Sequence, residues 1–225
     1  MITVSPFTKS YHGRTVLTFP NFSFEPSRIY AVIGSNGSGK STLARVLAGA
    51  EKADSAPMPL PSSVNIGYLP QKPYAFHMTL RRNILLNKEK NSSDSKARAE
   101  ELIHAFGLTA LAEKNGSSLS GGETARMALA RLMMKEYSLL ILDEPTAAID
   151  MNNTLRAEQA IREYTDRTKA SVLLITHSLK QALRLSDTVL YLENGELIEQ
   201  GVTTSVLNEP STMELRRFLD FYSLD

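Results

Sequence analysis

The stretch best suited to chemistry is a glycine-rich run at residues 34–42, GSNGSGKST. It fits G-x-x-x-x-G-K-[ST], in which glycines let the backbone curl until several N–H groups point at one anion. Lys40 would place its ammonium on the outer phosphates of a nucleotide, and the Ser41 hydroxyl would be a ligand of Mg²⁺. The predicted phosphate site consists of Gly34, Ser35, Asn36, Gly37, Ser38, Gly39, Lys40, Ser41 and Thr42.

The elements around this run fit the motif. Residues 29–33, IYAVI, form an apolar, β-branched run that predicts a buried strand. Residues 41–48 carry apolar side chains on one helical face and stop at Gly49. The alternative is an ordinary glycine-rich turn with a surface lysine, but such turns seldom lie between a buried strand and an amphipathic helix. The context therefore favours a phosphate-binding loop.

Composition sets bounds on the class of protein. The chain has 225 residues, 42% of them hydrophobic and 22% charged, as in a globular protein with a substantial core. Its formal net charge of +1 indicates no polyanion-binding surface, and the lack of cysteine excludes disulfides and thiolate metal sites. No apolar run approaches the roughly 18 residues that span a bilayer, and the N-terminus does not resemble a signal peptide. We expect a cytoplasmic protein that another chain would bring to a membrane.

Strand and helix patterns alternate along most of the chain, which predicts an α/β fold. Short strands are expected within residues 1–33, with a turn at 12–14, and at 64–69, 139–142 and 171–176, with a hairpin around Asn194-Gly195. Helical patterns occupy 97–106, 153–165, 178–185 and 212–222, and residues 79–134 are helical overall. The proline-rich stretch 50–63 predicts a loop, and the polar stretch 87–96 predicts a mobile connection.

Polar residues follow several of these strands. Gln71 comes after 64–69, Asp143 and Glu144 after 139–142, and His177 after 171–176, whereas Tyr11 precedes the turn at 12–14. Each has a structural interpretation as well: a surface glutamine, a satisfied core histidine or a half-buried strand tyrosine. Only their context can favour the functional interpretation.

A second glycine-containing stretch, LSGGE at residues 119–123, begins a predicted helix. Ser120 and Glu123 have the spacing of a capping box, which explains both residues structurally. It does not explain Gly121 and Gly122, since glycine costs about 1 kcal/mol in a helix relative to alanine. A helix N-terminus without side chains suits the close approach of a phosphate.

Taken together, these residues resemble the nucleotide-binding subunit of ABC (ATP-binding cassette) ATPases over nearly the whole chain. The seven motifs, in the family's order, are the A-loop aromatic Tyr11, the Walker A loop Gly34 to Thr42, the Q-loop Gln71, the signature at residues 119–123, Walker B at 139–144, the D-loop at 147–150 and the H-loop His177. The resemblance implies one domain over 1–225 with a P-loop NTPase fold. A RecA-like, mostly parallel sheet core with an N-terminal antiparallel β subdomain would occupy about 1–70 and 136–225, and an inserted α-helical signature subdomain about 71–135.

The resemblance also implies roles for individual residues. Lys40 would contact the phosphates, and Glu144 would be the base that activates water. Gln71 would reach the metal or that water, and His177 would bond the γ-phosphate. Asp143, Ser41 and Gln71 would hold Mg²⁺, while Tyr11 would stack on adenine.

The family's signature contacts the ATP of a second subunit. Ser120, Gly121 and Gly122 would therefore bind nucleotide in trans, across a head-to-tail dimer of identical or paralogous subunits. The implied function is ATP hydrolysis that drives a membrane transporter, and the resemblance favours a bacterial importer over an exporter. The subunit would lie on the inner face of the membrane, bound to permease subunits and, through them, to a solute-binding protein. The alternative is a soluble ABC ATPase acting on nucleic acid, the ribosome or complex assembly; the near-neutral charge gives no reason to expect nucleic acid.

Three departures from the family pattern stand out. Glu123 replaces the usual glutamine and puts a carboxylate near the partner's γ-phosphate, so we expect function to persist with weaker ATP-driven closure. The D-loop is Ala147-Ala148-Ile149-Asp150 rather than S-A-L-D, which removes a hydroxyl. Finally, Gln71 follows Lys40 by only 31 positions, which is short for the family.

Overall fold

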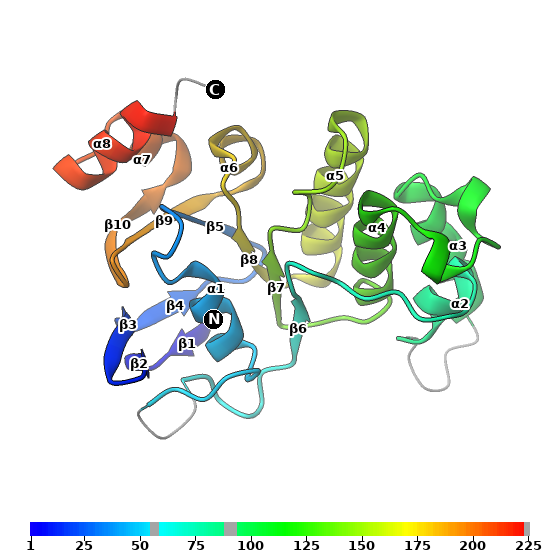
Figure 1. Cartoon of the computed structure of the whole chain (residues 1–225), viewed down its shortest axis with the longest axis horizontal. Helices are drawn as coiled ribbons and strands as arrows, with labels where there is room; N and C mark the ends of the chain where they lie inside the picture. Colours follow the sequence, from blue (N-terminus) through cyan, green and yellow to red (C-terminus); the bar gives the residue numbers. More distant parts are fainter. Residues whose placement is uncertain (55–58, 88–93, 223–225) are drawn as a thin grey trace.

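The computed structural model describes residues 1–54, 59–87 and 94–222 (Figure 1). The main sheet of these residues has the strand order β2-β3-β10-β9-β5-β8-β7-β6, and β1 pairs separately with β4. The bounds of the strands are β1 Ile2–Val4, β2 Phe7–Tyr11, β3 Arg14–Phe19, β4 Phe22–Phe24, β5 Ile29–Ile33, β6 Ile66–Leu69, β7 Leu139–Asp143, β8 Ser171–Ile175, β9 Thr188–Glu193 and β10 Glu196–Val202.

The centre of the sheet is parallel. β9, β5, β8, β7 and β6 run in one direction, whereas β10 pairs antiparallel with β9, and β2 antiparallel with β3. In register, Asp143 of β7 lies opposite Ile175 of β8, and Ile175 lies opposite Val32 of β5. The carboxyl ends of β5, β6, β7 and β8 therefore meet at one edge, the place where ligands bind in open α/β sheets.

Both faces of the sheet are covered. Side chains of β7 alternate, so that Leu139 and Ile141 pack with α1 (Lys40–Leu47), and Leu140 and Leu142 with α4 (Gly121–Leu132) and α5 (Met151–Thr168). Beyond them, α6 (Leu179–Leu185), α7 (Thr203–Asn208) and α8 (Met213–Tyr222) cover β5 and β9. Every residue of β5, β7 and β8 is buried, which is why these strands are continuous apolar runs in the sequence.

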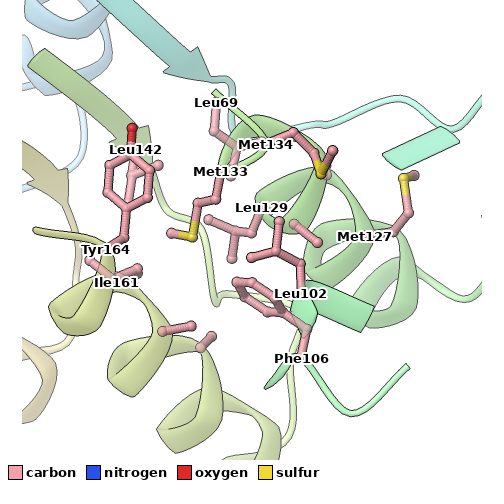
Figure 2. Close-up of a cluster of buried hydrophobic side chains, with 14 of the residues drawn as sticks. Leu69, Leu102, Phe106, Met127, Leu129, Met133, Met134, Leu142, Ile161 and Tyr164 are labelled. Carbon is pink, nitrogen blue, oxygen red and sulfur yellow. The ribbon is translucent and has the colours of Figure 1, made fainter. Parts of the chain in front are cut away.

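Helices α2 (Leu80–Leu85), α3 (Ser95–Ala105) and α4 gather at one end of the molecule, on the right in Figure 1. Two 3₁₀ turns, Thr109–Leu111 and Gly116–Ser118, join α3 to α4. Figure 2 shows that Leu129 of α4 and Met133, the residue that follows α4, lie between Phe106 at the end of α3 and Ile161 of α5. The apolar core therefore continues from the sheet into this group of helices.

The predicted elements agree with the structure in type, and the differences have local causes. α5 begins before residue 153 because Asp150 caps it, accepting a hydrogen bond from the Asn153 N–H at 3.1 Å. α3 begins at Ser95, inside the predicted connection 87–96. Residues 88–93 of that connection and 55–58 of the predicted loop 50–63 lie outside the described residues. α7 was not predicted, and its N-cap has no side-chain hydrogen bond.

No helix in the described ranges combines the length and the apolar character needed to cross a membrane.

Candidate functional site

The glycine-rich run connects β5 to α1 and leaves the N-terminus of that helix open. Gly34 has φ 147°, and a Cβ there would lie 2.0 Å from the Leu192 carbonyl oxygen, so only glycine fits. Gly39, with φ 101°, is the N-cap of α1 and supplies no side-chain hydrogen bond. The first N–H groups of the helix therefore have no side-chain acceptor, and the helix dipole favours an anion in front of them.

Lys40 lies inside this loop with only 5% of its surface exposed. Its Nζ donates hydrogen bonds to the carbonyl oxygens of Gly34 at 2.8 Å and Ser35 at 2.7 Å. Burial lowers the pKa of Lys40, while the carboxylates of Glu144 and Asp143 oppose that shift. A buried ammonium held by two neutral carbonyls gains electrostatic stabilisation when a phosphate arrives.

Asp143 ends β7 and meets the first turn of α1. Ser41 Oγ donates to Asp143 Oδ1 at 3.2 Å, and the aspartate is 2% exposed. Burial raises the pKa of Asp143, and the bond from Ser41 works against it. Among the described residues no group of three or more acidic, histidine or cysteine side chains could hold a metal. A hydroxyl beside one carboxylate instead fits Mg²⁺, which takes few protein ligands and completes its shell with water and phosphate oxygens.

Glu144 is engaged from both sides. Its Oε1 lies 2.6 Å from His177 Nε2, and its Oε2 accepts a hydrogen bond from Gln71 Nε2 at 2.9 Å. Its backbone has φ 50°, in the left-handed region that non-glycine residues seldom adopt. This turn at the end of β7 aims the carboxylate along the sheet edge, and such strain is concentrated at functional sites.

One cavity of about 320 Å³ joins most of the predicted residues. Its lining consists of Tyr11, Val16, Asn36, Gly37, Gly39, Lys40, Ser41, Thr42, Gln71, Glu144 and His177. The shortened segment between Lys40 and Gln71 thus still delivers Gln71 to the site, because β6 lies directly beside β7.

Tyr11 is held by residues that sequence patterns did not indicate. Its hydroxyl donates to Glu51 Oε2 at 2.5 Å, and Arg45 Nε lies 3.3 Å from the same oxygen. Glu51 is 40 positions away from Tyr11, so no local spacing could have linked them. The tyrosine ring therefore has a fixed place in the lining of the cavity.

The signature stretch lies apart from this cavity. The predicted capping box is present: the Glu123 N–H donates to Ser120 Oγ at 3.2 Å, and the Ser120 N–H donates to Glu123 Oε2 at 2.8 Å. A Cβ on Gly122 would lie 2.6 Å from the Ala148 carbonyl oxygen, so packing alone requires this glycine. The sequence analysis missed that structural reason. Gly121 meets only the Ala148 side chain, at 3.7 Å, and keeps the open position expected of a phosphate contact.

A phosphate loop joins the buried parallel strand β5 to the helix α1, and the carboxylates of Asp143 and Glu144 stand at the end of β7, two strands away from β5 in the sheet. This arrangement defines a P-loop nucleotide-binding protein. The family model described as "ABC transporter" matches residues 17–147, and the chain belongs to this family.

Relatives with established names support the assignment. The tungstate uptake system ATP-binding protein TupC of Peptoclostridium acidaminophilum is 36% identical over 207 residues, covering 88% of this chain and 97% of that protein. The aliphatic sulfonates import ATP-binding protein SsuB 1 of Pseudomonas fluorescens is 37% identical over 194 residues, covering 86% and 73%. A solved ATP-binding subunit of an ABC transporter has the same fold, with a TM-score of 0.85 at 21% identity over 98% and 99% of the two chains.

These findings confirm the predicted family, the P-loop NTPase fold and the activity: the chain is an ATP-binding, ATP-hydrolysing subunit of an ABC transporter. Subunits of this family dimerise and work with membrane permease components. The comparisons give no support to the alternative of a soluble ATPase acting on nucleic acid or the ribosome.

Proposed function

We propose that this chain energises a bacterial importer from the cytoplasmic face of the membrane, where it binds a separate permease. The observation that carries the proposal is Glu144, held between His177 and Gln71 at the edge of the sheet that also carries the phosphate loop. Relatives named for tungstate uptake and sulfonate import support the direction of transport. A solute-binding protein would act through the permease.

The reaction adds water to the γ-phosphorus of ATP and releases ADP and phosphate. Glu144 would accept the proton of the attacking water, and His177 would donate a hydrogen bond to a γ-phosphate oxygen. Lys40 and the N–H groups of the loop would hold the phosphates, and Tyr11 would stack on adenine. Ser41, Asp143 and Gln71 would hold Mg²⁺, which when bound neutralises charge on the phosphate oxygens.

The active unit would be a head-to-tail dimer. Ser120, the N-cap of α4, is exposed, and together with Gly121 and Gly122 it would contact the ATP held by the partner's loop. ATP would then lie between two subunits, and its hydrolysis would release them.

A conformational change at the nucleotide would be transmitted across the boundary between two subdomains. These are a RecA-like core at about 1–70 and 136–225 and a helical signature subdomain at about 71–135. Gln71 stands at that boundary and bonds Glu144. Beside it a groove of about 660 Å³ presents the exposed side chains of Tyr74, Phe76 and Leu86. This groove would receive the permease, so a change at the γ-phosphate would reach the membrane subunit.

Complementation between two inactive variants tests the dimer and the site together. Lys40→Ala removes the lysine that would hold the phosphates, and Ser120→Arg prevents the signature turn from contacting the partner's ATP. In a head-to-tail dimer, a mixed pair keeps one intact site, formed by Lys40 of one chain and Ser120 of the other. Mixing equal amounts should restore up to about a quarter of the wild-type rate, because half of randomly formed dimers are mixed. If the mixture stays as inactive as each variant, the in-trans site is wrong.

A further inference from the structure

The signature of this chain carries a charge that its helix must accommodate. Glu123 occupies the third position of α4, where glutamine would form the same capping box without a charge. Its side chain is 19% exposed and lies at the helix end that, in the proposed dimer, faces the phosphates of the partner's ATP. An unpaired carboxylate there would repel those phosphates.

A lysine from the preceding segment meets this carboxylate. Lys114 Nζ donates to Glu123 Oε2 at 2.9 Å, and the same oxygen accepts the Ser120 N–H. The bond from Lys114, followed by that from the Ser120 backbone, lowers the pKa of Glu123, so the carboxylate is charged at neutral pH and its charge is balanced locally. The backbone of Lys114 is fixed independently, since its carbonyl accepts the Leu80 N–H at 2.9 Å.

We propose that Lys114 is a positioning residue for ATP hydrolysis: its ion pair with Glu123 cancels the charge of this carboxylate and keeps the Ser120-Gly121-Gly122 turn able to approach the partner's phosphates. The inference rests on the proposed in-trans function of the signature. It explains how the chain tolerates glutamate at this position.

The test is a double-mutant cycle of Lys114→Met and Glu123→Gln in the full chain. Steady-state ATPase activity is measured in chains that keep Glu144. ATP-driven dimerisation is followed by size-exclusion chromatography in the same variants with Glu144→Gln added. Lys114→Met should raise the ATP concentration for half-maximal dimerisation about fivefold, as expected for loss of one partly exposed charge pair. Adding Glu123→Gln should return it to within about twofold of the value for Glu123→Gln alone, because a neutral residue needs no counter-charge.

Two further readouts separate charge from structure. The defect of Lys114→Met should shrink as salt rises from about 0.05 to 0.5 M, since repulsion is screened and a packing defect is not. ATP affinity of the monomer should not change, because the signature serves the partner's site. Lys96→Met makes the same chemical change on the exposed side of α3 and should match the wild type in every assay.

The inference is overturned if Lys114→Met dimerises like the wild type, or if the double variant is as defective as Lys114→Met alone. Its failure is distinct from failure of the proposed function. If Ser120→Arg retains full activity, the in-trans site itself is wrong, whatever the Lys114 variants do.

Discussion

His177 Nε2 and Glu144 Oε1 meet at 2.6 Å although they follow different strands. The parallel register of β7 and β8 brings this about, since it sets Asp143 opposite Ile175 and so carries the next residues to one place. Gln71, after β6, binds the other carboxylate oxygen at 2.9 Å. Each oxygen keeps a further lone pair with which it can accept a hydrogen bond from water. Three adjacent strand ends therefore fix the position of one carboxylate.

Glu144→Gln should stop turnover while keeping ATP binding. The amide preserves shape and can still bond Gln71 or His177, but it cannot accept a proton from water. We expect a loss in ATPase rate of at least about 100-fold, in line with removal of a general base, and accumulation of an ATP-bound dimer. Phosphate release and size-exclusion chromatography with ATP check both effects. Brisk hydrolysis by this variant would show that another group is the base.

Asp143→Asn should stabilise the nucleotide-free subunit while impairing activity. Burial raises the pKa of Asp143 above its ordinary value of 3.8, so the folded state binds more protons than the unfolded state between those two values. The free energy of unfolding therefore falls as pH rises through that window, and at pH 7 the charged aspartate costs stability. The asparagine variant should be more stable at pH 7, by about 0.5–2 kcal/mol, the range typical of single stabilising substitutions.

Urea unfolding at a series of pH values measures this difference. The gap between Asp143→Asn and the wild type should close as pH falls below 3.8, where the carboxyl is protonated in both states. A variant less stable than the wild type at pH 7 would mean that the bond from Ser41 outweighs the cost of burial.

Sequence patterns predicted the features that consecutive residues determine. β7 was predictable because both faces of the strand are buried, which leaves an uninterrupted apolar run. The phosphate loop was predictable because its geometry depends on a few glycines and a following helix. The capping box of Ser120 and Glu123 is likewise complete within four residues.

Contacts between distant segments were not predictable in the same way. The residues around Tyr11 in the sequence do not indicate its contact with Glu51. Likewise, the residues around Gly122 do not indicate the carbonyl oxygen of Ala148, which packing places 2.6 Å from the position that a Cβ on Gly122 would take. Lys114 lies only nine positions before Glu123, but the 3₁₀ turn Gly116–Ser118 between them decides that they meet. Such pairs depend on how elements are packed, which a single sequence does not display.

Tyr11→Ala should weaken ATP binding by about tenfold or more, because stacking of a base on an aromatic ring is worth about 1–3 kcal/mol. Tyr11→Phe keeps the ring and loses only the bond to Glu51, so we expect a loss of less than about fivefold. Isothermal titration calorimetry with ATP measures both. Tripolyphosphate, which has no base, should bind all three proteins equally. If Tyr11→Ala binds ATP like the wild type, the ring does not contact adenine.

The groove beside Gln71 should be needed for the permease and not for the chemistry. Tyr74, 60% exposed, and Leu86, 51% exposed, present apolar surface with little role in the core. Tyr74→Ser and Leu86→Ser should each reduce recovery of the co-expressed permease about tenfold, since anchors of this size contribute at least 1 kcal/mol to an interface, while the ATPase rate of the isolated subunit stays within about twofold. Phe221→Ser is the matched control, because this side chain is 75% exposed on α8, away from the groove. Equal loss with Phe221→Ser would mean that general solubility, rather than the groove, governs recovery of the complex.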